Sequence, residues 1–577
     1  MPLRVLCRYL LRYRARYAGG FALLLATNLA ALAIPWVIKE TIEAVAARAP
    51  WAAVGRGALV IVSLALLQGI TRAGSRFALL GASQRVEADI RNDLFRHLVR
   101  LSPVFYQGRR IGDLMSRATN DLHAVSMLIG FGFLSLVNTG LVFAGTLTAM
   151  LQLDPWLTLA TLGPAPALVL LATRFNARAH AASRDVQEQL SRLSDKVQEN
   201  LTGMAVVRAY TMETRETDAF RRLNGEYLRR TLRQARVEGT FSPLMGLIGG
   251  LGTLIVLWVG GRAVVDGRIT LGAFVAFASY LAHLTWPILA LGWVLAVSRR
   301  GVSALERIVE VLAETPSVQD GPGATAPVDL VGDIEFRRLT FGYERGRPPA
   351  LREVSLRIEA GTWVAVVGPT GAGKTTLVSL LARLWDPPPD AVFLDGREIH
   401  TIPLADLRRA VGYVPQEAFL FSRPLGENVA LGSGIERVPW AAEVARLAAD
   451  VRALPAGWDT VVGERGITLS GGQRQRATLA RALVREPSIL ILDDAFASVD
   501  TATEAEILAR LSQARRGRTA IMVTHRLRAA ELADRVVVLD QGRVVETGTH
   551  TELLARNGLY ARLRRRRELE ARLETTR

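Results

Sequence analysis

Lysine is nearly missing from this chain of 577 residues, although the chain is strongly basic. Lysine and arginine total 71 against 54 aspartates and glutamates, a formal net charge of +17, yet the only lysines are Lys39, Lys196 and Lys374. Because arginine supplies almost every basic charge, a lysine marks a position where a compact ammonium is expected to have a role of its own.

Cysteine is equally scarce, since Cys7 is the only one. A single cysteine excludes an internal disulfide and a cysteine metal cluster, so nothing points to an oxidising compartment. The basic excess does not indicate a nucleic-acid partner either, because the arginines of the first half lie between long apolar runs, where membrane orientation alone would place them.

Long apolar runs, by contrast, are abundant before residue 300, in a chain that is 50% hydrophobic. A helix needs about 20 apolar residues to cross a hydrocarbon layer of roughly 30 Å. We expect six crossings, near residues 17–38, 57–80, 124–150, 156–174, 240–264 and 271–297. Six crossings return the chain to the side on which it started.

Arginine defines that side. The second-to-third and fourth-to-fifth connections are long and carry arginines from Arg85 to Arg117 and from Arg174 to Arg236. By the positive-inside rule these connections and the basic N-terminus face the cytosol. A cleaved signal peptide is the alternative, but the run at 17–38 is longer than a signal core and other crossings follow, so residues 1–16 are expected to form an interfacial helix on membrane lipids.

The two long connections have helical periodicity, so the membrane helices are expected to continue into the cytosol as rods. Glycine and mixed polar residues place the short segments at their tips near residues 108–120 and 203–216. Within the crossings, Asn28 and Asn138 are among the polar exceptions, most of which are expected to bond between helices. The crossings hold no convincing acid–base pair, which argues against proton or sodium coupling.

A linker separates this transmembrane domain, residues 1–315, from a second domain. Residues 316–329 are rich in proline, glycine and small residues. Beyond 330, strand-like runs alternate with helices, at 334–336, 363–367, 391–394, 489–492, 520–523 and 535–539. The sequence therefore predicts an all-α membrane domain of six helices fused to a cytosolic α/β nucleotide-binding domain, residues 330–577, with a helix at its C-terminus.

A glycine-rich loop carries the most specific chemistry. A β-type run enters GPTGAGKT and continues as an amphipathic helix, the context that a phosphate-binding P-loop requires. Its glycines let backbone N–H groups surround phosphate oxygens, its lysine reaches the β- and γ-phosphates, and its threonine hydroxyl ligates Mg²⁺. The residues expected to bind ATP here are Gly368, Pro369, Thr370, Gly371, Ala372, Gly373, Lys374, Thr375 and Thr376.

An acidic residue that binds Mg²⁺ should end a buried strand downstream of such a loop. The run SILILDD supplies it, with Asp493 following four apolar residues. A strand-end cap is the plain alternative for Asp493, and the loop upstream favours the metal. ATP and Mg²⁺ are therefore the expected cofactors.

The segment LSGGQ, residues 469–473, precedes Asp493 by some twenty residues, and RQRATLARAL follows it. It resembles the signature motif of ABC ATPases, and the resemblance extends over nearly the whole chain, including the six crossings and the two cytosolic tips, which look like that family's coupling helices. The resemblance implies that Ser470, Gly471, Gly472 and Gln473 contact the nucleotide held by a second ATPase domain.

Other residues match the family one by one. Tyr343 resembles the aromatic residue that stacks on adenine, and Gln416 the glutamine near Mg²⁺ and the attacking water. Asp500 resembles the D-loop aspartate and His525 the switch histidine on the γ-phosphate. Residues 460–466, TVVGERG, look like a segment of exporters rather than importers. The resemblance implies half of an exporter that needs a second half-transporter.

One departure concerns catalysis. Where the family has a glutamate that orients the attacking water, this chain has Asp494, which is one methylene shorter. A displacement of about 1 Å can lower the rate by roughly a hundredfold, so we expect weak hydrolysis at this P-loop. Because LSGGQ is intact, a heterodimer whose partner supplies the glutamate, as in heterodimeric bacterial multidrug exporters, is favoured over a homodimer with a slow site.

The expected function is outward transport of hydrophobic or amphiphilic compounds, such as drugs, lipids or peptides, across the bacterial cytoplasmic membrane. A regulatory subunit that transports nothing is the alternative that Asp494 favours. The C-terminal tail contains an arginine cluster, residues 564–567, which is expected either to clasp a partner's tail or to end as a solvated helix.

Overall fold

The computed structural model describes residues 2–163, 165–321, 323–324, 327–344, 346–463, 466, 468–515 and 517–575. It divides the chain into two compact units. The first consists of residues 1–98 and 112–313 and is helical, and the second consists of residues 99–111 and 314–577 and contains all the described strands.

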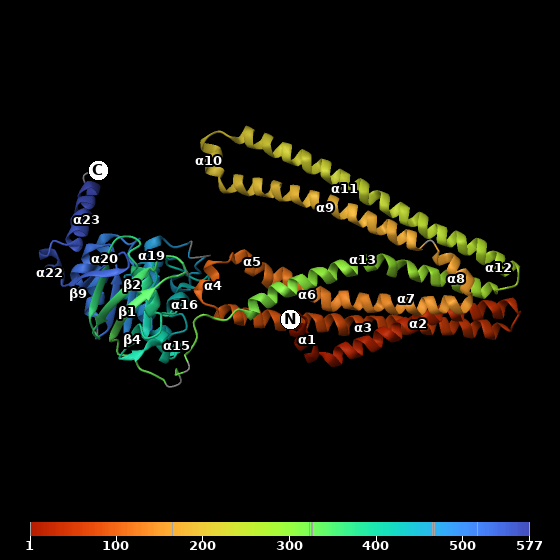
Figure 1. Ribbon diagram of the computed structural model, residues 1–577, viewed down its shortest axis with the longest axis horizontal. Helices are drawn as coiled ribbons and strands as arrows, with labels where there is room; N and C mark the ends of the chain where they lie inside the picture. The colour runs from red at the N-terminus through yellow and green to blue at the C-terminus, as the bar shows by residue number, and fades with distance from the viewer. Residues whose placement is uncertain are drawn as a thin grey trace. The chain divides into compact units, whose positions relative to one another are not determined.

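Long helices build the first unit (Figure 1). Helix α13 packs against α2 and α7, and α9 packs against α11. A rod from Ile111 to Leu153 contains two π-helical turns between its α-helical segments. The elements are α1 (Pro2–Arg12), α2 (Arg14–Ala46), α3 (Trp51–Arg100), α5 (Ile111–Ser116), η1 (Arg117–Asp121), α6 (Leu122–Met127), η2 (Leu128–Gly132), α7 (Phe133–Leu153), α8 (Pro155–Leu162), α9 (Ala165–Thr202), α10 (Met204–Ala209), α11 (Glu213–Ile255), η3 (Val256–Gly260), α12 (Gly261–Val265) and α13 (Leu271–Ala313).

Three of these helices are long and apolar enough to cross a membrane, by length and composition, in the described part of the chain. They are Arg14–Ala46, Trp51–Arg100 and Ile111–Leu153, and the shorter apolar helices Gly250–Val265 and Leu271–Leu284 overlap the fifth and sixth predicted crossings. Within the fourth, Pro164 lies outside the described residues.

Polar side chains join the membrane helices, as expected. The Asn28 amide donates to the Asn138 side-chain oxygen at 3.2 Å, and the Thr27 hydroxyl donates to Thr71 at 2.9 Å. In an apolar surrounding such bonds replace those that water would otherwise make.

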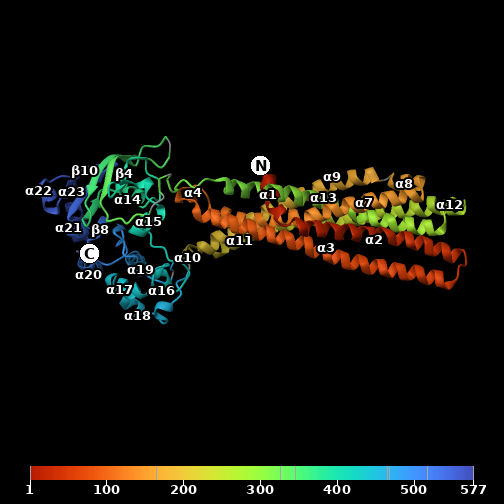
Figure 2. The same ribbon diagram turned by 90° about the horizontal axis from the view of Figure 1, so that it is seen from below.

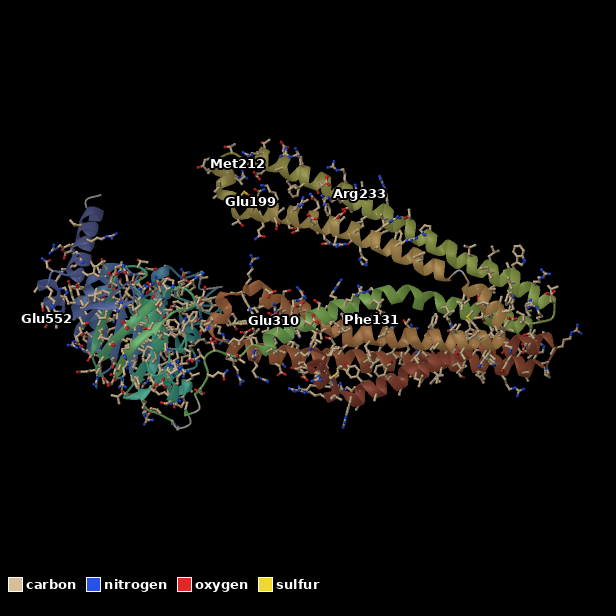
Figure 3. All side chains as sticks on the ribbon, in the orientation of Figure 1. Phe131, Glu199, Met212, Arg233, Glu310 and Glu552 are labelled. Carbon is tan, nitrogen blue, oxygen red and sulfur yellow. The ribbon has the colours of Figure 1, made fainter. Side chains whose placement is uncertain are left out.

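Helices α9 and α11 form a hairpin that splays away from α2, α3, α7 and α13 and is closed at its tip by α10 (Figure 1). Lys196 bridges the hairpin near this tip, with Nζ 3.1 Å from Glu199 and 2.6 Å from Glu216. Glu199 and Met212 flank α10 in Figure 3. Helix α10 lies inside the predicted tip segment 203–216.

The other tip differs from its prediction. Its short helix, α4 (Pro103–Gln107), ends where the predicted segment 108–120 begins, and most of that segment is helical rod. Ser102 and Pro103 begin α4, because proline is favoured at a first helical position, whereas Gly108 ends the helix. The Ser102 hydroxyl lies 2.5 Å from the Ser317 hydroxyl, so this tip packs with the start of the linker.

Two sheets form the second unit. One is antiparallel in the order β2-β1-β4-β5, and the other has the order β10-β9-β3-β8-β7-β6, with β9, β3, β8, β7 and β6 parallel. The strands are β1 (Ile334–Phe341), β2 (Leu351–Ile358), β3 (Trp363–Val367), β4 (Val392–Leu394), β5 (Arg397–Glu398), β6 (Val411–Val414), β7 (Ile489–Asp493), β8 (Thr519–Val523), β9 (Arg535–Asp540) and β10 (Arg543–Gly548).

The six-stranded sheet is buried on both faces. Along β3, Val364 and Val366 point into one apolar core, and Trp363, Ala365 and Val367 point into the other. Figure 2 shows α17 and α18 on the opposite side of the unit from β4 and β10. The helices are α14 (Lys374–Leu381), η4 (Ile399–Thr401), α15 (Leu404–Ala410), α16 (Leu425–Ala430), η5 (Ile435–Arg437), α17 (Val438–Val444), α18 (Ala448–Ala453), η6 (Gly457–Asp459), α19 (Gly471–Val484), α20 (Thr501–Gln513), α21 (Leu527–Leu532), α22 (His550–Ala555) and α23 (Leu559–Thr575).

The predicted linker lies against this second unit. The carbonyl of Gln319 accepts from Arg383 at 2.9 Å, and the Asp320 carboxylate accepts from the Leu404 backbone N–H at 2.7 Å. Pro322, Thr325 and Ala326 of the linker lie outside the described residues. Two neighbouring residues near the start of the linker are thus bonded to the second unit, one by Arg383 and one by the start of α15.

Candidate functional site

The P-loop joins β3 to α14 and curls around its own lysine. Gly371 and Gly373 have φ of +80° and +97°, which glycine adopts without the steric cost that other residues incur. Lys374 is 6% exposed, and its ammonium donates to the carbonyls of Gly368 at 3.0 Å and Pro369 at 2.8 Å. Burial lowers the pKa of Lys374, and the carboxylates of Asp494 and Asp493 oppose this effect.

Asp493 ends β7, two strands away from β3 in the sheet. Its carboxylate accepts from the Thr375 hydroxyl at 3.1 Å and from the Tyr413 hydroxyl at 3.2 Å. Burial raises the pKa of Asp493, whereas these two hydroxyl donors act in the opposite direction. The parallel sheet therefore brings the P-loop threonine and the predicted metal-binding acid together.

These residues fit a magnesium ion. A carboxylate and a hydroxyl meet at one point, and Mg²⁺ is bound by one or two such oxygen ligands together with substrate phosphates rather than by an all-protein cage. Among the described residues, no group of three or more His, Cys, Asp or Glu side chains could hold a metal ion by itself.

Asp494 has a fixed backbone. Its N–H donates to the Val523 carbonyl at 2.9 Å, its carbonyl accepts from the Ala497 N–H at 3.1 Å, and its φ is +47°. Aspartate tolerates this left-handed conformation better than most residues. These two hydrogen bonds restrict backbone movement that could bring the short Asp494 side chain closer to the P-loop.

Aromatic side chains line the start of the ATPase unit. The Tyr343 hydroxyl lies 2.8 Å from the Thr376 hydroxyl, and its ring, 44% exposed, meets Trp385 edge to face at 4.6 Å between centroids. The structure thus places Tyr343 beside the P-loop helix. The sequence analysis did not single out Trp385, because its approach depends on the tertiary fold.

The signature segment begins α19. Ser470 caps the helix in a capping box with Gln473, whose amide also donates to Asp450 at 3.1 Å. A side chain on Gly472 would come within 2.9 Å of the Ser498 carbonyl, so the second glycine permits close packing with the loop after Asp494. Helix α19 packs against α16 and α17 rather than on the P-loop side of the sheet.

The remaining predicted residues lie at the ends of three elements. Gln416 is exposed just after β6, and His525 follows β8, the strand between β3 and β7. Asp500 caps α20, and the N–H of Thr503 donates to it at 2.9 Å and lowers its pKa. Of the exporter-like segment 460–466, Glu464 and Arg465 lie outside the described residues.

Arg481 is a residue that sequence reasoning missed. It lies on α19 and donates to the Phe419 carbonyl at 2.9 Å and the Asn428 carbonyl at 2.8 Å, and burial lowers its pKa to about 10. It therefore ties the signature helix to the segment that follows Gln416. Its place in RQRATLARAL gave no signal, because arginine is the common basic residue throughout the chain.

Known proteins share both parts of this architecture. Residues 18–288 match the ABC transporter transmembrane region and residues 351–497 match the ABC transporter family. The chain is 36% identical to the probable multidrug resistance ABC transporter ATP-binding/permease protein YheI of Bacillus subtilis, over 96% of both chains, and 35% identical to the multidrug resistance-like ATP-binding protein MdlA of Escherichia coli, over 98% of this chain and 96% of that one.

A lipid relative and a solved structure agree with these matches. The ATP-dependent lipid A-core flippase of Nitrosococcus oceani is 34% identical over 88% of this chain and 85% of its own. The structure of a bacterial Atm1-family ABC exporter with ATP bound matches 96% of this chain and 99% of its own with a TM-score of 0.79 and 28% identity. The predicted fold class is confirmed, and the chain belongs to the ABC exporters, membrane ATPases in which a helical transmembrane domain is fused to an ABC ATPase domain that drives transport.

Proposed function

We propose that this chain is one half of a dimeric exporter that moves hydrophobic or amphiphilic compounds out of the cytosol or the inner leaflet of a bacterial cytoplasmic membrane. The names of its relatives support this substrate class, since two are multidrug resistance proteins and one is a lipid A-core flippase. The arginine-rich connections support a cytosolic N-terminus and ATPase domain.

A second half-transporter is the expected partner. The P-loop follows strand β3 of the six-stranded sheet. The signature segment instead begins α19, which packs with α16 and α17. Two domains facing each other would bring one chain's P-loop to the other's Ser470. The tip helix α10 also presents apolar side chains to solvent, with Met204 42% and Val206 56% exposed, which favours a surface of the second chain as its cover.

We expect MgATP to bind side chains that bond to the P-loop itself, or to each other, in this structure. The Lys374 ammonium would exchange its bonds to the loop carbonyls for the β- and γ-phosphates, and Thr375 and Asp493 would hold the metal. A Mg²⁺ ion held there would supply positive charge beside the phosphate oxygens. Tyr343 would contact adenine, and Gln416 would join Thr375 and Asp493 near the Mg²⁺ and the attacking water. His525 would contact the γ-phosphate, and Asp500 would lie at the seam with the second chain.

The roles that we assign to the two chains of the dimer rest on Asp494. Its backbone is bonded on both sides, so a shift of the chain cannot restore the reach of a glutamate. We infer that this P-loop binds MgATP and hydrolyses it slowly, while the intact LSGGQ completes a faster site on the partner. This asymmetry favours a heterodimer over a homodimer with two slow sites.

A regulatory subunit is the second candidate, favoured by the same aspartate. In that case ATP would lock the dimer and no compound would cross. The test is the ATPase rate of the wild-type chain and its Asp494→Glu and Lys374→Ala variants, each with and without a candidate partner.

Transport predicts that Asp494→Glu raises the rate by about tenfold or more, that Lys374→Ala abolishes the gain, and that hydrophobic compounds stimulate turnover. Absence of turnover in every combination would support regulation. Fast hydrolysis by the wild-type chain alone would contradict the impaired site.

A further inference from the structure

A cavity of about 420 Å³ adjoins the P-loop. Four segments line it: the end of β3 with the first P-loop residues, Val367–Thr370; the turn after β8, Thr524–Arg526; Ala530 of α21; and one face of the C-terminal helix α23. The cavity therefore lies between the loop that is expected to hold the triphosphate and the helix whose arginine cluster has so far had no role.

The face of α23 that lines the cavity follows helical spacing. Tyr560, Leu563 and Arg566 recur every three residues, and Arg564 lies four residues after Tyr560, so all four share one side. Arg565, between them in sequence, does not line the cavity and instead bonds to Asn557.

Side-chain bonds hold this wall in place. His550 accepts at Nε2 from the Arg564 guanidinium at 2.7 Å, because arginine can only donate, so the ring proton is on Nδ1, 2.7 Å from the Tyr560 hydroxyl oxygen. Arg564 also donates to Glu568 at 2.8 Å. These bonds fix α23 against α22.

The charged side chains that line the cavity all have one sign. They are Arg526, Arg564 and Arg566, joined by His525, and no carboxylate is among the lining residues that the structure describes. From outside the lining, Glu504 pairs with Arg526, and Glu568 and Glu531 pair with Arg564. Such a chamber suits a small, multiply charged anion with several acceptor oxygens.

We propose that this cavity is a receiving site for orthophosphate, in which the α23 arginines that line it, Arg564 and Arg566, hold the phosphate that leaves the P-loop after ATP is cleaved. The proposal rests on the proposed function, because it takes Gly368–Thr370 as part of the triphosphate site. It gives the C-terminal helix a part in product release rather than in clasping a partner.

The test uses the full-length transporter in detergent, loaded with MgADP, with inorganic phosphate as the probe. Phosphate binding is followed by ³¹P line broadening, which needs no turnover, and MgATP affinity is measured separately. Arg566→Gln removes one charge-assisted contact, so we expect it to weaken phosphate binding about three- to tenfold. MgATP affinity should be unchanged, and Arg566→Lys should recover most of the lost phosphate affinity.

Arg565→Gln is the matched control, since it removes the same charge from the same helix outside the cavity. Equal effects of the two glutamine variants, or none, would overturn the proposal. Weaker MgATP binding with unchanged phosphate binding would assign Arg566 to the bound triphosphate and also overturn it. If the parent protein bound MgATP no better than Lys374→Ala, the proposed function itself would fail, a result that is distinct from both.

Discussion

The glycines of the P-loop differ in what surrounds them, although all were predicted from one motif. Gly371 and Gly373 both have positive φ. A side chain at Gly371 would meet open space, whereas one at Gly373 would come within 2.7 Å of the Ala350 carbonyl. The motif identifies the loop, but only the packing of β2 beside it distinguishes the two positions.

This difference predicts two unequal alanine variants. Gly371→Ala should lose about 1–2 kcal/mol of stability from its backbone conformation alone. Gly373→Ala should lose about 1–3 kcal/mol more, because the methyl group overpacks against Ala350. Thermal unfolding of both full-length variants, with and without MgATP, measures the gap. Equal losses would mean that the loop moves freely away from Ala350.

At the residue scale, the sequence predicted which groups meet but not every bond they make. The strand–loop–helix context brought Thr375 to Asp493, because parallel strands end at one edge of a sheet. Tyr413 and Trp385 could not be predicted, since each reaches the site from a distant segment. Of the three lysines, Lys374 is central to the candidate site and Lys196 bridges α9 and α11.

At the scale of elements, the linker is anchored to the P-loop helix. Arg383 follows α14 directly, its side chain is fully buried, and it bonds Asp386 at 2.8 Å and the Gln319 carbonyl at 2.9 Å. The composition of residues 316–329 predicted a linker but gave no sign of these bonds, because a buried arginine cannot be told from a surface one in a sequence so rich in arginine.

Arg383→Met should free the linker while retaining the volume of the side chain. We expect a loss of about 1.5–3 kcal/mol from the charged hydrogen bonds and faster proteolysis between residues 314 and 329, with MgATP affinity kept. Arg543→Met is the control, because Arg543 pairs with Glu353 at 3.0 Å where both side chains are exposed, at 56% and 65%. Unchanged proteolysis in Arg383→Met would show that other contacts hold the linker.

The parallel strands of the six-stranded sheet were predicted better than the antiparallel strands. Six strand-like runs coincide with β1, β3, β4, β7, β8 and β9, whereas β2, β5, β6 and β10 were missed. Strand β2, for example, alternates charged and apolar residues and pairs in an antiparallel sheet, so its pattern is weaker than that of the buried strands. The first tip helix was misplaced for a similar reason, because Gly108 outweighed the start signal at Ser102 and Pro103.

At the scale of the whole molecule, the arrangement of motifs implies that one chain is not a complete ATPase. The P-loop leads into α14, which packs in one apolar core of the ATPase unit, and LSGGQ leads into α19, which packs in the other. Helix α10 leaves apolar side chains exposed at the tip of its hairpin. In a dimer, the P-loop of one chain would meet the LSGGQ segment of the other, and the exposed side chains of α10 would meet a surface of the second chain. These features do not distinguish a second copy of this chain from a related one.

Mixing two disabled variants of this chain distinguishes those partners. Lys374→Ala removes the P-loop contact, and Ser470→Arg places a bulky cation where the γ-phosphate should lie, so neither variant alone should retain MgATP after gel filtration. If the chain pairs with itself, a mixed dimer contains one site built from an intact P-loop and an intact signature. Such a dimer should trap about half of the wild-type nucleotide, because two independent sites become one. If the natural partner is a different chain, as we propose, the mixture should trap no more than the separate variants, and retention should appear when the partner is added to either variant, because each variant keeps one of the two motifs that a site shared with the partner needs.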